Sequence, residues 1–385
     1  MPADSDETLA DYLAPFATLQ AYSLRRGMIY RGRIEDRFAA DRPRLHRVLE
    51  AAPGSYRLRD VDGRLYATLR VGGTPGWRVW LWANLALLGL TGVTALAAGA
   101  DLSSPEPTGF AVLPFRFLID SATRVVLGEW RVVAGTYVPR FLQVMATGAP
   151  YAAALLFVLM AHELGHYLAA RRHDIDATLP FFIPAPFFFG TLGAIIRMRS
   201  PIPDRRVLFD VGVAGPLAGV AAGILVSIVG LRMSSYGPPG TCSTGPIVLQ
   251  HSLLFQWLAR LVMGPPLGDH CIHLHPVAVA GWFGLFITFL NLMPIGQLDG
   301  GHVMYALLGR AQRYLGLMAV AAILAMGLRF PGWLMLALLV LTVLGVKHPP
   351  VMDESVRPGA GRLLIGLLVV LLFLGLFIIE PVIPQ

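Results

Sequence analysis

The chain has 385 residues, of which 55% are hydrophobic and only 14% are charged, and its mean hydropathy is +0.61. Soluble domains carry about 25% charged residues, so this composition excludes a disordered chain, a coiled coil and a small disulfide scaffold. Several apolar runs approach or exceed the roughly 18 residues that mark a membrane span. The composition therefore predicts a polytopic membrane protein rather than one soluble core.

Basic residues exceed acidic ones, with 31 Lys and Arg against 24 Asp and Glu and a formal net charge of +7. They cluster beside the apolar runs and come with no zinc-finger, helix-turn-helix or RNA-binding signature. We therefore expect contact with the lipid bilayer, not with nucleic acid. The two cysteines, Cys242 and Cys271, are too few for a cysteine-based zinc site. They can form one disulfide if their loop faces an oxidising compartment.

The polar N-terminal part divides into two predicted regions. Residues 1–26 are expected to be a flexible tail. Residues 27–72 are predicted to form a small soluble β-α-β-β module, whose last two strands meet in a hairpin at Asp62-Gly63, a strong two-residue turn signal. The role of this module stays open among gating of substrate access, binding of a partner, and docking on the membrane through its arginines.

Seven apolar segments follow the module. The predicted fold class is an all-α polytopic membrane protein with about seven transmembrane helices, a short membrane-associated β segment and a small N-terminal α/β soluble module. The predicted spans are residues 77–98, 149–170, 211–231, 277–293, 315–328, 333–346 and 363–379. Residues 77–148 comprise the first of these helices and a non-cytoplasmic segment, and residues 304–385 comprise the C-terminal helices. The distribution of Lys and Arg predicts a cytoplasmic N-terminus.

The chemistry is concentrated in two motifs of the central membrane core, residues 149–303. His162 and His166 are four residues apart in a predicted helix, so both imidazoles project from one face and can share a metal ion. Glu163 lies beside the first histidine, where it can reach a metal-bound water. Ionisable groups within a span are costly and usually mark a functional interior, so the pattern predicts a metal site.

A catalytic zinc usually takes three protein ligands, so a third must come from elsewhere in the chain. The apolar span that begins near residue 277 is interrupted by Pro294 and Gly296, and such breaks are tolerated where they line a buried polar cavity. Asp299 follows this break and precedes two glycines, which makes it the preferred third ligand. His302, just beyond it, is the competing candidate.

The two motifs together, HELGH and NLMPIGQLDGG, resemble those of the site-2 protease family of intramembrane zinc metalloproteases (peptidase family M50). The intervening pieces FFIPAP, GTLGAIIRMRSPIPDRR and VGVAGPLAG are most similar to the plastid-type ethylene-dependent-gravitropism-deficient branch and its bacterial relatives. The resemblance implies that His162, His166 and Asp299 hold one Zn²⁺ per chain, with Glu163 as the catalytic general base. It also implies that Asn291 helps to hold the substrate.

A predicted strand lies between the two motifs. Its β-branched residues and glycines favour either a buried strand that packs beneath the helices or an edge that accepts an unwound substrate as an added strand. In the second interpretation the substrate-binding residues are Gly190, Thr191, Leu192, Gly193, Ala194 and Ile195.

The sequence thus predicts a zinc metalloendopeptidase that cleaves transmembrane protein substrates. We expect an integral membrane protein of a bacterial inner membrane, and the sequence sets no oligomeric state. The main alternative is a membrane transporter or channel that uses the same histidines to bind metal without proteolysis, since broken helices are common there too. A catalytically idle relative is disfavoured because every residue that the chemistry needs is present.

Overall fold

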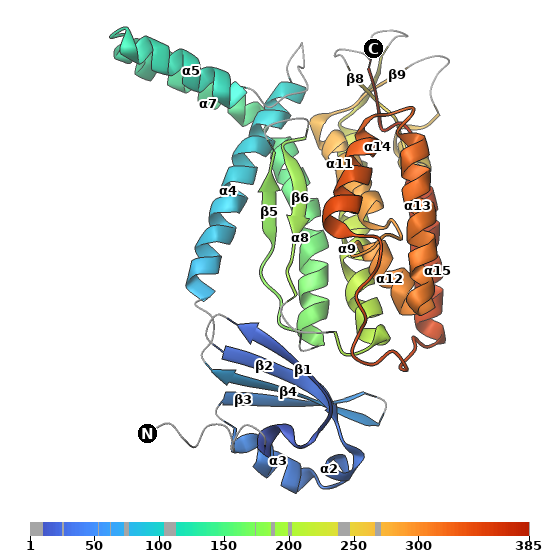
Figure 1. Cartoon of the computed structure of the whole chain (residues 1–385). Coiled ribbons are helices and arrows are strands. Elements are labelled where there is room, and N and C mark those ends of the chain that lie inside the picture. The colour runs from blue at the N-terminus through green and yellow to red at the C-terminus, as the bar shows by residue number, and fades with distance from the viewer. Residues whose placement is uncertain are drawn as a thin grey trace.

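The fold is described from a computed structural model. It describes residues 11–24, 27–52, 54–61, 63–72, 77–103, 113–173, 175–185, 189–198, 202–237, 247–265 and 271–384. The membrane helices stand side by side in one bundle, and the N-terminal module lies against one end of it (Figure 1).

The N-terminal module is an antiparallel four-stranded sheet with strand order β1-β2-β4-β3. The predicted strand and hairpin are present as β2 and the β3–β4 pair, and Gly63 at the turn has φ +76°. The strands are β1 (Phe16–Leu24), β2 (Gly27–Ile34), β3 (Gly54–Val61) and β4 (Arg64–Gly72). The expectation of a flexible tail over residues 1–26 is corrected by β1, which pairs with β2 along its length. Cross-strand pairing supplies order that the local pattern of this segment does not reveal.

Two short helices, α2 (Asp36–Ala40) and α3 (Arg42–Glu50), cover one face of this sheet (Figure 1). Leu45 and Leu49 of α3 are fully buried against Leu65 and Leu69 of β4. Because side chains alternate across a strand, Arg64, Tyr66 and Thr68 of β4 point to the other face of the sheet. That other face contacts the membrane domain, as described below.

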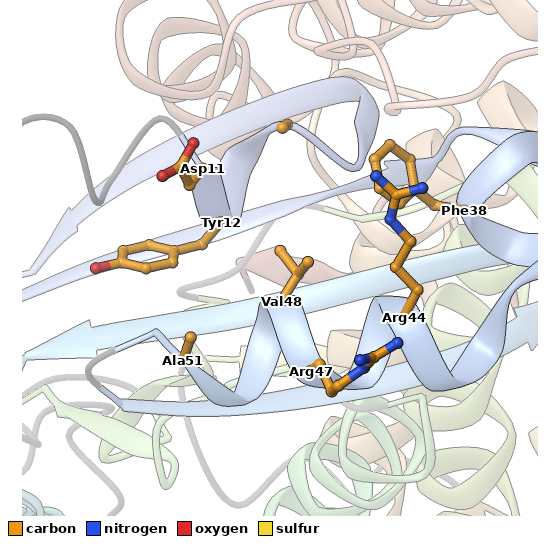
Figure 2. Close-up of a pocket in the computed structure, with 8 residues that line it drawn as sticks. Asp11, Tyr12, Phe38, Arg44, Arg47, Val48 and Ala51 are labelled. Carbon is orange, nitrogen blue, oxygen red and sulfur yellow. The ribbon is translucent and has the colours of Figure 1, made fainter.

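A groove of about 690 Å³ runs along the exposed side of α3 (Figure 2), and α3 lies on the side of the module away from the bundle (Figure 1). Arg44 and Arg47 extend along it, and Phe38 and Tyr12 flank it. Its other lining residues are Asp11, Ala14, Val48 and Ala51. Its position on the outer side of the module separates it from the chemistry in the bundle.

Four helices of the described residues are long and apolar enough to cross a membrane, namely Leu81–Leu102, Ala149–Arg172, Arg205–Arg232 and Asp299–Met326. Four shorter apolar helices accompany them, namely Leu253–Met263, Pro276–Asn291, Gly332–Val343 and Ala360–Leu376. The chain is therefore a mostly helical integral membrane protein with small sheets. The helix at Leu253–Met263 falls within the 233–275 stretch that the sequence analysis leaves without a span, and Ser252 caps its first turn.

In chain order the helices are α4 (Trp77–Leu102), α5 (Leu113–Val126), α6 (Trp130–Val132), η1 (Val133–Tyr137), α7 (Val138–Thr147), α8 (Ala149–Arg172), α9 (Arg205–Arg232), α10 (Leu253–Met263), α11 (Pro276–Asn291), α12 (Asp299–Leu308), η2 (Gly309–Ala311), α13 (Gln312–Met326), α14 (Gly332–Leu339), η3 (Val340–Leu344) and α15 (Ala360–Leu376). The α5–α7 arm projects sideways from the bundle at the end opposite the N-terminal module (Figure 1). Helices α8, α9, α11 and α12 form the centre of the bundle and share its largest hydrophobic core.

Three two-stranded sheets complete the membrane domain. Strand β5 (Phe181–Pro184) pairs antiparallel with β6 (Thr191–Ile195), and this hairpin stands between α4 and α8 (Figure 1). At the opposite end of the bundle from the module, β7 (Ser235–Gly237) pairs with β9 (Cys271–His273), and β8 (Ile247–Leu249) pairs with β10 (Val382–Pro384). Cys271 is disulfide-bonded. The chain's other cysteine, Cys242, lies outside the described residues.

Candidate metal centre

The two histidines of the HELGH motif lie in the middle of the bundle. They are four residues apart on α8, and both side chains are buried. The helical spacing brings the two imidazoles together, with their Nε2 atoms 3.2 Å apart. At this distance no side chain lies between the two Nε2 atoms, so both can bind one ion.

Asp299 reaches the same point from the other side of the bundle. It is the first residue of α12, directly after the interrupted stretch that follows α11. One carboxylate oxygen, Oδ2, lies 3.2 Å from His162 Nε2 and 3.2 Å from His166 Nε2. The three side chains can therefore hold one metal ion between them. Gly300 and Gly301 permit the approach, since a Cβ at either position would lie within 2.3 Å of a backbone oxygen of the preceding turn.

The spacing of these three atoms fits a tetrahedral zinc ion. Zinc binds imidazole nitrogen and carboxylate oxygen at about 2.0–2.2 Å, and tetrahedral angles then place neighbouring ligand atoms about 3.3 Å apart. The three donor atoms form a triangle with sides of 3.2 Å. Three such donors leave the fourth position for a water molecule or a substrate oxygen, as catalytic zinc sites require.

Helix α9 supports the imidazoles in two ways. The Nδ1 atom of His166 lies 2.8 Å from the backbone oxygen of Val211, which fixes the ring and leaves Nε2 for a metal. Glycines on the same helix provide the room, because a Cβ at Gly215 would lie 2.0 Å from His166 Nε2 and a Cβ at Gly219 would lie 2.7 Å from His162 Nδ1. From the sequence, these two glycines are expected only to permit close helix packing. Their four-residue spacing, which matches that of the histidines, is the signal that identifies them.

Glu163 and Asn291 stand beside the three donor atoms. Glu163 is buried, and the backbone N–H of Ile196 donates a hydrogen bond to its carboxylate. Asn291, at the end of α11, places its Nδ2 atom 3.3 Å from His162 Nε2. Its amide thus faces the same small volume as the histidines, where it can contact a bound substrate.

The competing ligand His302 lies on α12 but faces away from the cluster. Its Nδ1 atom is 2.6 Å from Nε2 of His348, which lies in the segment after η3. The imidazole is therefore held by a second histidine. The geometry favours Asp299 over His302 as the third donor.

The predicted substrate-binding strand is β6, preceded by Gly190. Leu192 and Ile195 are 63% and 56% exposed, whereas Thr191 is buried and donates a hydrogen bond to the Ile183 oxygen. Within the described residues β6 pairs only with β5. Its other edge therefore carries no strand there, and Gly193 (φ +104°) and Ala194 lie along it.

The hairpin that contains β6 is anchored by two side chains of the first membrane helix, α4. Asn84 donates hydrogen bonds to the backbone oxygens of Leu179 and Pro180, at 2.8 and 2.7 Å. Thr94 donates to the Gly190 oxygen at 2.6 Å. These contacts fix both ends of the hairpin relative to α4.

A buried His-Glu-His-Asp arrangement inside candidate membrane spans defines a membrane-embedded metal-site protein of the HExxH class. Residues 150–330 match peptidase family M50. This segment of the chain is therefore similar to that family, the site-2 proteases.

Three curated relatives are described as probable zinc metalloproteases of chloroplasts. EGY1 of Oryza sativa subsp. japonica is 39% identical over 176 residues, which cover 44% of this chain and 30% of that protein. EGY1 of Arabidopsis thaliana is 32% identical over 59% of this chain and 42% of its own length, and EGY2 of the same plant is 33% identical over 62% and 43%. The chain thus spans less than half the length of these relatives. No solved structure matches.

Proposed function

We propose that the protein is a zinc metalloendopeptidase that cleaves membrane-embedded protein substrates. The observation that carries this proposal is the convergence of His162, His166 and Asp299, whose donor atoms are 3.2 Å apart beside the buried Glu163. Similarity to the site-2 protease family and to probable zinc metalloproteases supports it. Each element of the site comes from a helix within the membrane bundle.

Each residue of the site has a separate role in peptide hydrolysis. His162, His166 and Asp299 would hold a zinc ion, which would act as a Lewis acid and lower the pKa of bound water. Glu163 takes a proton from the attacking water and delivers it to the leaving amine. The Ile196 N–H keeps the Glu163 carboxylate turned toward the start of the loop that follows β6. Asn291 donates a hydrogen bond that orients the substrate backbone.

The substrate class follows from the environment of the site. A peptide bond within a transmembrane helix is hydrogen-bonded and shielded, so attack requires local unwinding, and the released backbone groups then need partners in an apolar medium. The free edge of β6 offers such partners by strand addition. Residues Gly190, Thr191, Leu192, Gly193, Ala194 and Ile195 form this substrate-binding edge, with the exposed Leu192 and Ile195 side chains available to the bound segment.

We propose a topology in which about seven helices cross the bilayer and the N-terminal module faces the cytoplasm. The disulfide-bonded Cys271 lies at the opposite end of the bundle (Figure 1), which suits an oxidising compartment. The short basic loops lie at the module's end, as the positive-inside rule requires. In a bacterial inner membrane these two sides are the periplasm and the cytoplasm.

The test is purification of the full chain in detergent, with metal analysis and cleavage of a transmembrane test substrate in the presence and absence of a chelator. We expect one zinc per chain, cleavage that the chelator abolishes, and recovery on addition of zinc. Glu163→Gln should retain zinc and lose cleavage, because it keeps the ligands and removes the base. Metal flux across liposomes without cleavage would instead support a transporter and overturn the proposal.

A further inference from the structure

The segment after η3 touches the metal-bearing part of the bundle at several points. We name residues 346–356 the bridging segment. The backbone oxygen of Val346 accepts a hydrogen bond from the Gly296 N–H at 3.2 Å. Gly296 belongs to the interrupted stretch just before Asp299, so the bridging segment begins at the loop that leads into α12.

His348 is the second point of contact, and it lies against two residues of α12. Its Nε2 atom is 2.6 Å from His302 Nδ1, so one of the two nitrogens donates a hydrogen bond to the other. Its ring stacks on that of Tyr305, with centroids 4.4 Å apart and an interplanar angle of 25°. The Tyr305 hydroxyl in turn donates to Glu354 at 2.9 Å. Two consecutive turns of the helix that begins at Asp299 are thus held by the bridging segment.

The N-terminal module holds the other side of the bridging segment. Arg64 and Tyr66 lie on the face of β4 opposite α3, and both contact Oδ2 of Asp353, at 2.8 and 2.9 Å. Burial raises the pKa of Asp353, but hydrogen bonds from Ser355, Tyr66 and Arg64 outweigh it and leave the pKa below its ordinary value. Burial and the bond to Asp353 raise the pKa of Tyr66, so this hydroxyl remains a donor at neutral pH.

The module also contacts the helix that carries the two histidines. Arg31 of β2 is only 2% exposed, and its guanidinium lies 3.5 Å from the backbone oxygen of His173, at the C-terminal end of α8. A cation at this end of a helix is favourable because the last carbonyls carry partial negative charge. One face of the sheet therefore contacts both halves of the metal site, α8 directly and α12 through the bridging segment.

We propose that His348 and the bridging segment are positioning elements of the metal site, and that the N-terminal module sets the position of Asp299 through Arg64 and Tyr66. A metal centre needs its ligands held to within about 0.5 Å, and α12 enters the site from a broken stretch whose Gly296 N–H is bonded to the bridging segment. Release of Asp353 from the module lets the bridging segment, and with it the first turns of α12, move. This inference rests on the proposed function, because it concerns the geometry of the same site.

The first test compares His348→Ala with His348→Gln in the full chain, using zinc affinity and the absorption spectrum of the Co²⁺-substituted protein. Loss of an outer partner of a metal site lowers metal affinity or activity by roughly 10–100-fold, and we expect His348→Ala to fall in this range with KM unchanged. His348→Gln can still hydrogen-bond His302 and should recover much of the loss. Unchanged zinc affinity and an unchanged cobalt spectrum in folded His348→Ala would overturn the proposal.

The second test uses the module and a matched control. Arg64→Met combined with Tyr66→Phe removes the contacts to Asp353, whereas Arg42→Met with Tyr56→Phe makes the same exchanges where the partners, Asp60 and Glu50, lie within the module. In metal-free protein we expect amide hydrogen exchange over residues 296–305 to accelerate up to about tenfold in the first variant, since the lost pairing is worth about that factor. The control should match wild type.

The outcomes separate this inference from the proposed function. A wild-type protein that binds zinc but cleaves no substrate contradicts the proposed function, while zinc affinity and hydrogen exchange still measure positioning. If His348→Ala does not fold, the two double variants decide the matter. Equal exchange over residues 296–305 in both of them would refute control by the module.

Discussion

A single methyl group on α9 should weaken zinc binding about 100-fold without replacing a ligand residue. In Gly215→Ala the new Cβ would lie 2.0 Å from His166 Nε2 and 2.2 Å from its Cδ2. Contacts below about 3 Å do not occur between such atoms, so the imidazole must leave the position from which it faces His162 and Asp299. The helix cannot yield instead, because α9 is buried along most of its length.

The expected loss can be estimated from zinc energetics. Four-ligand zinc sites bind with about 10–16 kcal/mol, or roughly 3 kcal/mol for each ligand, which corresponds to about a 10²-fold weaker affinity when one is lost. The extra methyl also costs about 1–3 kcal/mol of stability through overpacking. The assay is competition for zinc against a chromophoric chelator, with thermal unfolding measured in parallel.

Gly223→Ala is the matched control on the same helix. Its Cβ would meet Leu285 Cδ2 at 2.7 Å, so it carries a similar packing penalty away from the imidazoles. We expect both variants to lose stability and only Gly215→Ala to lose zinc. A zinc affinity in Gly215→Ala within threefold of that in Gly223→Ala would refute the argument that this glycine makes room for a metal-binding ring.

Three further predictions concern other parts of the chain. Asp299→Ala should lower zinc stoichiometry at a fixed chelator concentration, and unchanged metal content would point to a different third ligand. Asn84→Ala should loosen the β5–β6 hairpin by removing the hydrogen bonds to the Leu179 and Pro180 oxygens. We expect faster hydrogen exchange in β6 and a higher KM, with zinc retained. Unaltered exchange in β6 would show that Asn84 does not anchor the hairpin. Cys271 should react with a thiol reagent only after reduction, whereas labelling without reduction would contradict the disulfide.

The grouping of the three candidate metal ligands was predictable because chemistry constrains it. The spacing of His162 and His166 is dictated by the helix period, and Asp299 stands out because a carboxylate after a broken apolar run is costly. The sequence favoured Asp299 over His302, and the distances from Asp299 Oδ2 to both imidazoles support that preference. The contact of His302 with His348 was not predictable, because it spans 46 residues of sequence.

Parts of the fold lacked such a local signal. The segment that forms β1 shows little alternation, and its order comes from pairing with β2. The small residues of α9 predicted close helix packing, but a pattern of glycines does not say which side chain fills the space. The contacts of Arg64 with Asp353 likewise depend on how the module is placed, which no periodicity encodes.

The segment that matches the family model does not contain all the contacts that hold the candidate site. Residues 150–330 contain every predicted ligand and the base, yet the hydrogen bonds from Asn84 and Thr94 that secure the β-hairpin come from before it. His348, which braces the helix of the carboxylate ligand, comes from after it. A fragment limited to residues 150–330 would keep the candidate ligands and base but lose the side chains that position them. An exchange of this fragment between homologues should therefore preserve activity only if Asn84, Thr94 and His348 are exchanged with it.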